Sequence, residues 1–116
     1  MGKPMALNLR KQGFPLVVHS RSPAPVDALV AAGAASADSP AEVASEADVV
    51  ITMLPDSPDV QLVLEGPHGV FGSVRPGAIL IDMSTISPAL TRDLAAHAAA
   101  RGATLFFVLL QLHALD

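Results

Sequence analysis

Short, continuous apolar runs alternate along this chain with segments that begin at Ser-Pro pairs. Serine is a favoured N-terminal cap of a helix and proline suits the first helical position, so each pair predicts a helix start. A glycine after such a segment predicts a helix end. The predicted starts are Ser22-Pro23, Ser39-Pro40, Ser57-Pro58 and Ser87-Pro88, the second also fitting a capping box with Glu42, and the predicted ends are Gly13, Gly33, Gly66 and Gly102.

The apolar runs between these helices do not alternate with polar residues. Continuous runs are typical of parallel strands that are buried on both faces. Strand and helix therefore alternate throughout, which predicts an α/β fold with a parallel sheet. The chain opens directly on a helix, so this sheet is expected to lack its first strand. The predicted strands are 15–19, 48–54, 78–82 and 104–108, with a weak one around Ala35.

Composition excludes several classes of function. The 116 residues suffice for one domain with a core, and 51% hydrophobic against 16% charged residues excludes intrinsic disorder. A net charge of −4 argues against nucleic-acid or anionic-membrane partners. The chain has no cysteine and no histidine pair with metal-ligand spacing, so no metal site is expected. No apolar run is long enough to span a bilayer. We expect a soluble protein of the cytoplasm or of another reducing intracellular compartment.

Four stretches carry a resemblance to a known family. Together they are similar to the N-terminal domain of the β-hydroxyacid dehydrogenases, which include 3-hydroxyisobutyrate dehydrogenase, tartronate semialdehyde reductase and glyoxylate/succinic semialdehyde reductase. Their order and spacing make the resemblance specific. The stretches are Gly2–Leu9 (G-x-x-M-A-x-N-L), Ala47–Pro55 (the fourth strand and its turn), Gly66–Val70 (G-x-x-G-V) and Asp82–Pro88 (D-x-S-T-x-x-P).

The resemblance implies a Rossmann-like, doubly wound parallel sheet that lacks its first strand. It covers residues 1–105, which we interpret as a partial NAD(P)-binding domain, and residues 106–116 as a divergent apolar tail. It implies hydride transfer between a nicotinamide dinucleotide and a short β-hydroxyacid or aldehyde. The family's catalytic lysine lies in a second domain, whereas Lys3 and Lys11 both fall on the first helix. We therefore expect no catalytic residue in this chain and no activity of the chain alone. The alternative is a non-catalytic truncated fragment that retains no cofactor binding and acts at most as an interaction partner.

Two segments are expected to bind the dinucleotide. The resemblance implies that Met1 and Gly2 open a helix whose free N–H groups face the pyrophosphate. An acidic residue that selects NAD is expected about 20 residues further on. Ser20, Arg21 and Ser22 stand there instead, and Arg21 suits a 2′-phosphate, so NADP is the expected cofactor and NAD the second choice. The alternative for Gly2 is that it only begins an ordinary helix. The alternative for Arg21 is that it is a solvated residue of a turn.

Further site residues are implied by the resemblance alone. Leu54, Pro55, Asp59 and Thr85 are expected to contact the cofactor, and Ser84 to hold the carboxylate of the substrate. Asp59 is equally explained as a first-turn acid that complements a helix dipole, and Ser84 with Thr85 as a loop hydroxyl pair. Asp82 is expected to anchor its turn by accepting backbone N–H groups. His68 and His97 are interpreted as a loop residue and an exposed helix position.

Overall fold

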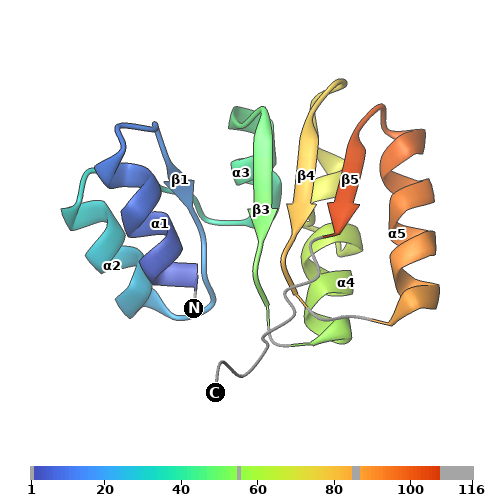
Figure 1. The fold of residues 1–116 in the computed structure, drawn as a ribbon, viewed down its shortest axis with the longest axis horizontal. Helices are drawn as coiled ribbons and strands as arrows, with labels where there is room; N and C mark the ends of the chain where they lie inside the picture. Colours follow the sequence, from blue (N-terminus) through green and yellow to red (C-terminus); the bar gives the residue numbers. More distant parts are fainter. Residues whose placement is uncertain (1, 55, 85–86, 108–116) are drawn as a thin grey trace, which may run out of the picture.

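Helices and parallel strands alternate in the computed structural model, which describes residues 2–54, 56–84 and 87–107 (Figure 1). The strands are β1 (Val17–Val18), β2 (Ala35–Ser36), β3 (Val49–Thr52), β4 (Ile79–Asp82) and β5 (Thr104–Phe107). The helices are α1 (Gly2–Lys11), α2 (Pro23–Ala31), α3 (Pro40–Glu46), α4 (Ser57–Glu65) and α5 (Pro88–Ala100), with a 3₁₀ turn η1 (Val70–Gly72) between α4 and β4. Each predicted strand is present, although β1 is shorter than expected.

The strands form two parallel sheets. One pairs β1 with β2, and the other has the order β3-β4-β5. In the part of the chain described, no strand pairs with the other edge of β1 or of β3, and these two strands are neighbours in Figure 1. One strand placed between them would give the order of a Rossmann sheet, in which the first strand lies at the centre. The prediction of a Rossmann-like α/β fold is therefore confirmed, and no described strand occupies the central position.

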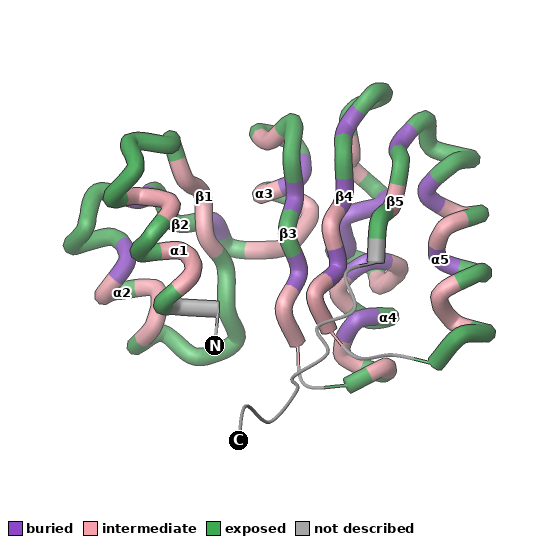
Figure 2. The backbone as a smooth tube through the Cα atoms, in the orientation of Figure 1, coloured by how far each residue is buried: buried purple, intermediate pink, exposed green. Residues whose placement is uncertain are grey.

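The main core lies on one face of the β3-β4-β5 sheet. Val50 and Leu80 belong to one core cluster with Leu64 of α4 and Leu94 of α5, which are almost completely buried. Figure 2 shows buried residues on β3, β4, α4 and α5. Phe71 of η1 closes the same cluster. At about 25 cal/mol for each Å² of apolar surface removed from water, burial of one such leucine stabilises the fold by roughly 1.5–3 kcal/mol. This core holds the ends of β3 and β4 in fixed positions.

The opposite face of the same sheet is exposed. Val49, Ile51, Ile79 and Phe106 share this face because the register aligns them, and their exposed fractions are 49%, 37%, 41% and 51%. The prediction that the strands are buried on both faces is thus wrong for β3 and β4. The reason is packing: among the described residues, the core cluster fills only the face that carries Val50 and Leu80.

The helix caps follow the Ser-Pro prediction in part. Ser39 and Ser87 accept hydrogen bonds from the backbone N–H groups of Glu42 and Leu90. Ser22 caps α2 without a side-chain hydrogen bond. Helix α4 begins at the predicted Ser57-Pro58 pair, but the prediction that the serine is the cap is wrong here, because Asp56 is the N-cap and accepts from the N–H of Asp59.

The capping box is half formed, and the helix ends mostly agree with the predicted glycines. Glu42 Oε2 accepts from the N–H of Asp38, one residue before the expected partner, Ser39. Gly33 and Gly102 take the positive φ values of 105° and 78° that end α2 and α5. A β-carbon at Gly33 would lie 2.9 Å from Arg10 Nε. None of the described helices is long and apolar enough to cross a membrane.

The proposed division into residues 1–105 and 106–116 stays a prediction. Strand β5 continues through Phe107. The remaining residues of the expected tail, 108–116, lie outside the described part of the chain.

Candidate functional site

The predicted site residues gather at one edge of the structure, where the strands end. All the strands run parallel within their sheets, and α1 begins at the edge to which they point (Figure 1). Ser20, Arg21 and Ser22 follow β1, Leu54 follows β3, and Ser84 follows β4. Ligands of open α/β sheets bind at this carboxyl edge, beside the position where the strand order reverses. The edge is therefore the candidate site.

Arg21 and Asp59 meet across the two halves of the structure. Arg21 Nη2 lies 3.2 Å from Asp59 Oδ1, which joins the end of β1 to the first turn of α4. The side chain of Arg21 is 72% exposed, whereas that of Asp59 is 21% exposed. Each was predicted as a cofactor contact, but their ion pair was not foreseen. Nothing in the sequence signals it, since the two residues are far apart along the chain.

The serines beside Arg21 remain exposed. Ser22 donates its backbone N–H to Ser20 Oγ at 3.3 Å, which bends the chain before α2. No carboxylate occurs between β1 and α2. This turn therefore presents one cation and two hydroxyl groups to a ligand.

Ser84 lies between the ends of β3 and β4. Its Oγ accepts a hydrogen bond of 2.7 Å from the backbone N–H of Leu54. A serine hydroxyl has one proton and two acceptor positions, so this contact leaves its proton free to be donated elsewhere. Ser84 is partly buried, and its oxygen is held by the backbone. This arrangement suits a hydroxyl that donates to an anionic ligand.

A buried hydrogen-bond network fixes the turn that carries Ser84. Asp82 is 0% exposed, and its Oδ1 accepts from Thr52 Oγ1 at 2.6 Å and from the N–H of Ser84 at 3.3 Å. The expected anchoring role of Asp82 is confirmed by the second contact. The analysis of the sequence missed Thr52. Its signal is a hydroxyl residue inside an otherwise apolar strand, in register with Asp82.

Several predicted residues cannot be placed at this edge. Met1, Pro55 and Thr85 lie outside the described residues, whereas Gly2 lies at this edge as the first residue of α1. Over the ranges the structure describes, no three histidine or acidic side chains are placed to hold a metal ion. The site therefore consists of an arginine, hydroxyl groups, backbone N–H groups and one paired carboxylate.

His97 differs from its predicted role as an exposed helix position. Its Nδ1 lies 2.7 Å from Glu65 Oε2, and its ring packs at 4.6 Å on that of Phe71. The side chain is 38% exposed. His68 lies in an exposed turn, as expected. His97 thus links α5 to α4 and does not reach the carboxyl edge of β1 and β3.

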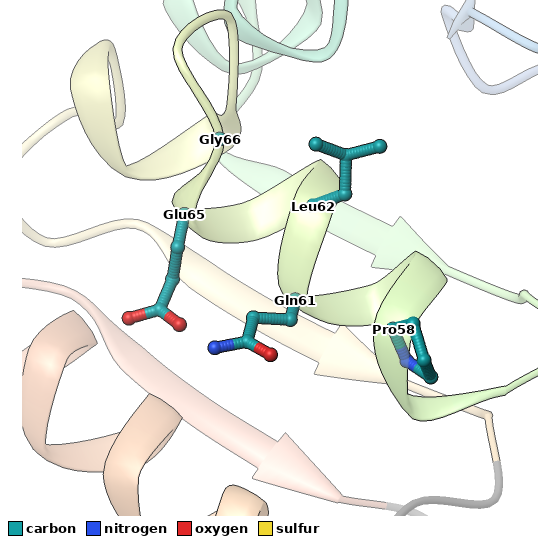
Figure 3. Close-up of a pocket in the computed structure, with 5 residues that line it drawn as sticks. All are labelled: Pro58, Gln61, Leu62, Glu65 and Gly66. Carbon is teal, nitrogen blue, oxygen red and sulfur yellow. The ribbon is translucent and has the colours of Figure 1, made fainter.

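A shallow hollow on α4 does not compete with the carboxyl edge as a site. It is lined by Pro58, Gln61, Leu62, Glu65 and Gly66, which all belong to α4 or its end (Figure 3). Leu62 and Glu65 point in different directions in this view, and Glu65 is already paired with His97. The lining of the hollow offers only two polar side chains, those of Gln61 and Glu65, and no cation.

Comparison with known proteins agrees with this geometry. Residues 1–108 match the family described as the NAD binding domain of 6-phosphogluconate dehydrogenase. The chain belongs to this family. It is 50% identical over 95 residues to the probable mitochondrial 3-hydroxyisobutyrate dehydrogenase of Dictyostelium discoideum, a match that covers 82% of this chain and 30% of that protein.

Solved structures show the same fold. The 3-hydroxyisobutyrate dehydrogenase of Mycobacterium tuberculosis, solved with L-serine, is 34% identical and has a TM-score of 0.82 over 92% of this chain and 36% of its own. Psf3 in complex with NADP+ and 2-OPP is 30% identical, with a TM-score of 0.85 over 90% and 37% of the two chains. The resemblance to hydroxyacid dehydrogenases is therefore confirmed. The chain spans about a third of the length of these relatives.

Proposed function

We propose that this chain supplies the dinucleotide site of an oxidoreductase that transfers hydride between NADP(H) and a short β-hydroxyacid or aldehyde acid. The observation that carries the proposal is the carboxyl edge, along which Arg21, Ser84 and the start of α1 all lie at the ends of parallel strands. Dehydrogenase relatives of the same fold support it.

The groups at this edge fit the dinucleotide. The first N–H groups of α1 have no partner within the helix and point toward an approaching pyrophosphate. Arg21 can pair with a 2′-phosphate, and the absence of an acid in the 19–22 turn removes the residue that selects NAD. The matching family is described as NAD binding, whereas the similar structure of Psf3 is a complex with NADP+. The preference of this chain for NADP is therefore part of the proposal. The proposed cofactor contacts are Met1, Gly2, Ser20, Arg21, Ser22, Leu54, Pro55, Asp59 and Thr85.

The proposed role of Ser84 is to hold the carboxylate of the substrate. Its oxygen already accepts from Leu54, and its proton stays available for donation to a ligand. The cofactor, when bound, supplies or accepts the hydride. The family resemblance implies that a lysine of a second domain moves the proton that accompanies the hydride, whereas Lys3 and Lys11 of this chain belong to α1.

Calorimetric titration with NADPH and with NADH tests this function. We expect saturable binding of both, and tighter binding of NADPH. Arg21→Gln should weaken NADPH binding at least tenfold, because a charge-assisted hydrogen bond contributes about 1.5–3 kcal/mol. The control is Arg101→Gln, which removes the same charge just before the N-terminal end of β5, at the opposite edge. Equal losses in the two variants, or no binding by the wild type, would contradict the proposal.

The second candidate function is that of a non-catalytic interaction partner. The exposed apolar face of Val49, Ile51, Ile79 and Phe106 favours it, since exposed apolar patches mark contact surfaces. On this reading the chain binds no dinucleotide, and Ile51→Thr weakens self-association in sedimentation experiments. Dinucleotide binding together with a monomeric chain would exclude this candidate.

A further inference from the structure

We propose that Asp59 sets the preference between NADP(H) and NAD(H) by competing with the 2′-phosphate for Arg21. The inference rests on the proposed dinucleotide site and adds a residue that tunes its selectivity. Its basis is the contact of 3.2 Å between Arg21 Nη2 and Asp59 Oδ1.

The two partners of this ion pair are held differently. Asp59 lies in the first turn of α4, and its backbone N–H donates to Asp56 Oδ1. A carboxylate in the first turn is stabilised by the positive end of the helix dipole. Arg21 lies in the bend before α2, and its side chain is 72% exposed. The carboxylate is thus the more buried partner, on a helix turn, and the guanidinium the more exposed one.

A 2′-phosphate that pairs with Arg21 competes with the carboxylate of Asp59 for the guanidinium. If Arg21 keeps its contact with Asp59, one cation is shared by two anions, and the phosphate lies a few ångströms from a like charge. If Arg21 turns away, the ion pair is lost. Both routes reduce the free energy of binding for a ligand that carries the extra phosphate.

A dinucleotide without the 2′-phosphate avoids this competition. Its ribose hydroxyl has no charge, so Asp59 neither repels it nor competes with it for Arg21. Asp59 therefore lowers the ratio of NADP to NAD affinity while Arg21 raises it. The preference of the site is the balance of these two side chains.

Asp56 provides the matched control. It lies on the same helix end and carries the same charge, but its Oδ1 accepts from the N–H of Asp59, and no described contact joins it to Arg21. Asparagine is as good an N-cap as aspartate, so Asp56→Asn removes the charge and keeps the helix. Asp59→Asn likewise retains the shape of its side chain.

The experiment measures the dissociation constants of NADP+ and NAD+ for the wild type and both variants by calorimetry. We expect Asp59→Asn to raise the NADP+/NAD+ affinity ratio about five- to tenfold, and Asp56→Asn to change it less than twofold. In an Arg21→Gln background the effect of Asp59→Asn should fall to less than half. Partial unfolding of a variant lowers both apparent affinities equally, so the ratio still reports selectivity.

Two outcomes separate the inference from the function on which it rests. If the wild type binds both dinucleotides and Asp59→Asn leaves their ratio unchanged, or if Asp56→Asn raises it equally, the role of Asp59 is overturned and the site stands. If neither the wild type nor Asp59→Asn binds NADP+ or NAD+, the proposed function itself is overturned, and this inference with it.

Discussion

Replacing Thr52 by valine should destabilise the fold although it creates no cavity. Valine puts a methyl group in the place of the hydroxyl, so the shape of the side chain is kept. The change removes the hydrogen bond of 2.6 Å from Thr52 Oγ1 to Asp82 Oδ1. Asp82 is 0% exposed and Thr52 8% exposed, so water does not replace the lost donor. Asp82 Oδ1 then keeps only the contact of 3.3 Å from the N–H of Ser84.

The size of the loss follows from this burial. A hydrogen bond to a charged group contributes about 1.5–3 kcal/mol to stability. When a buried acceptor loses its donor, the cost of removing that acceptor from water is no longer offset. We expect Thr52→Val to lower the free energy of unfolding by about 2 kcal/mol. The chain has no tryptophan, so urea unfolding is best followed by circular dichroism at several denaturant concentrations.

The same substitution at an exposed strand position is the control. Thr104 begins β5 in the same sheet and is exposed, and Thr104→Val should change the stability by less than about 0.5 kcal/mol. A loss below about 0.5 kcal/mol for Thr52→Val, or an equal loss for the two variants, would refute the reasoning. A double-mutant cycle with Asp82→Asn then assigns the loss, since the cost of Thr52→Val should fall when the charge is absent.

Three further predictions concern the caps, the core and the activity. Ser39→Ala should lower the free energy of unfolding in urea by about 1 kcal/mol, because the cap hydrogen bond from the N–H of Glu42 is lost. Ser22→Ala, which removes no cap hydrogen bond, should lower it by only a few tenths of a kcal/mol. Equal losses would contradict the cap assignment. Leu94→Ala should lower stability by about 2–5 kcal/mol because its site is fully buried, and Leu62→Ala, 58% exposed, by less than 1 kcal/mol; similar melting temperatures would contradict the described core. The purified chain should not oxidise NADPH with glyoxylate or succinic semialdehyde in an absorbance assay, since the catalytic lysine implied by the family resemblance lies in a second domain. Steady turnover would overturn the assignment of the proton-transferring group to a region outside this chain.

Local signals made most of the fold predictable. The Ser-Pro pairs and the glycines located the helices, because capping and positive φ depend on a few adjacent residues. The apolar runs located the strands. The Ser57 cap was mistaken because Asp56, one residue earlier, is an equally good cap, and the sequence does not decide between two adjacent capping residues.

The exposure of one face of the sheet could not be predicted from the apolar runs. Val49 and Ile51 are as apolar as Val50, yet they are exposed because no described helix packs on their face. An apolar run shows that a strand can be buried, but the partner that buries each face is set by packing over the whole molecule.

In the candidate site, too, local contacts were predictable from the sequence and long-range contacts were not. Asp82 was predictable as an anchor because its partner, the N–H of Ser84, is two residues away. The contacts of Thr52 with Asp82 and of Arg21 with Asp59 join residues about 30 or more positions apart, and they exist only because parallel strands bring their carboxyl ends together. The sequence proposed residues for the candidate site but did not predict how they pair.

The position of the dinucleotide is the central claim, and chemical-shift mapping of the backbone amides tests it most directly. On titration of the labelled chain with NADP+, we expect the largest shifts at the start of α1, at Ser20–Ser22, and at Leu54 and Ser84. The amides of Gly33, Gly77 and Gly102, at the opposite edge of the strands, should shift little. Shifts concentrated at those glycines, or none at any NADP+ concentration, would contradict the account.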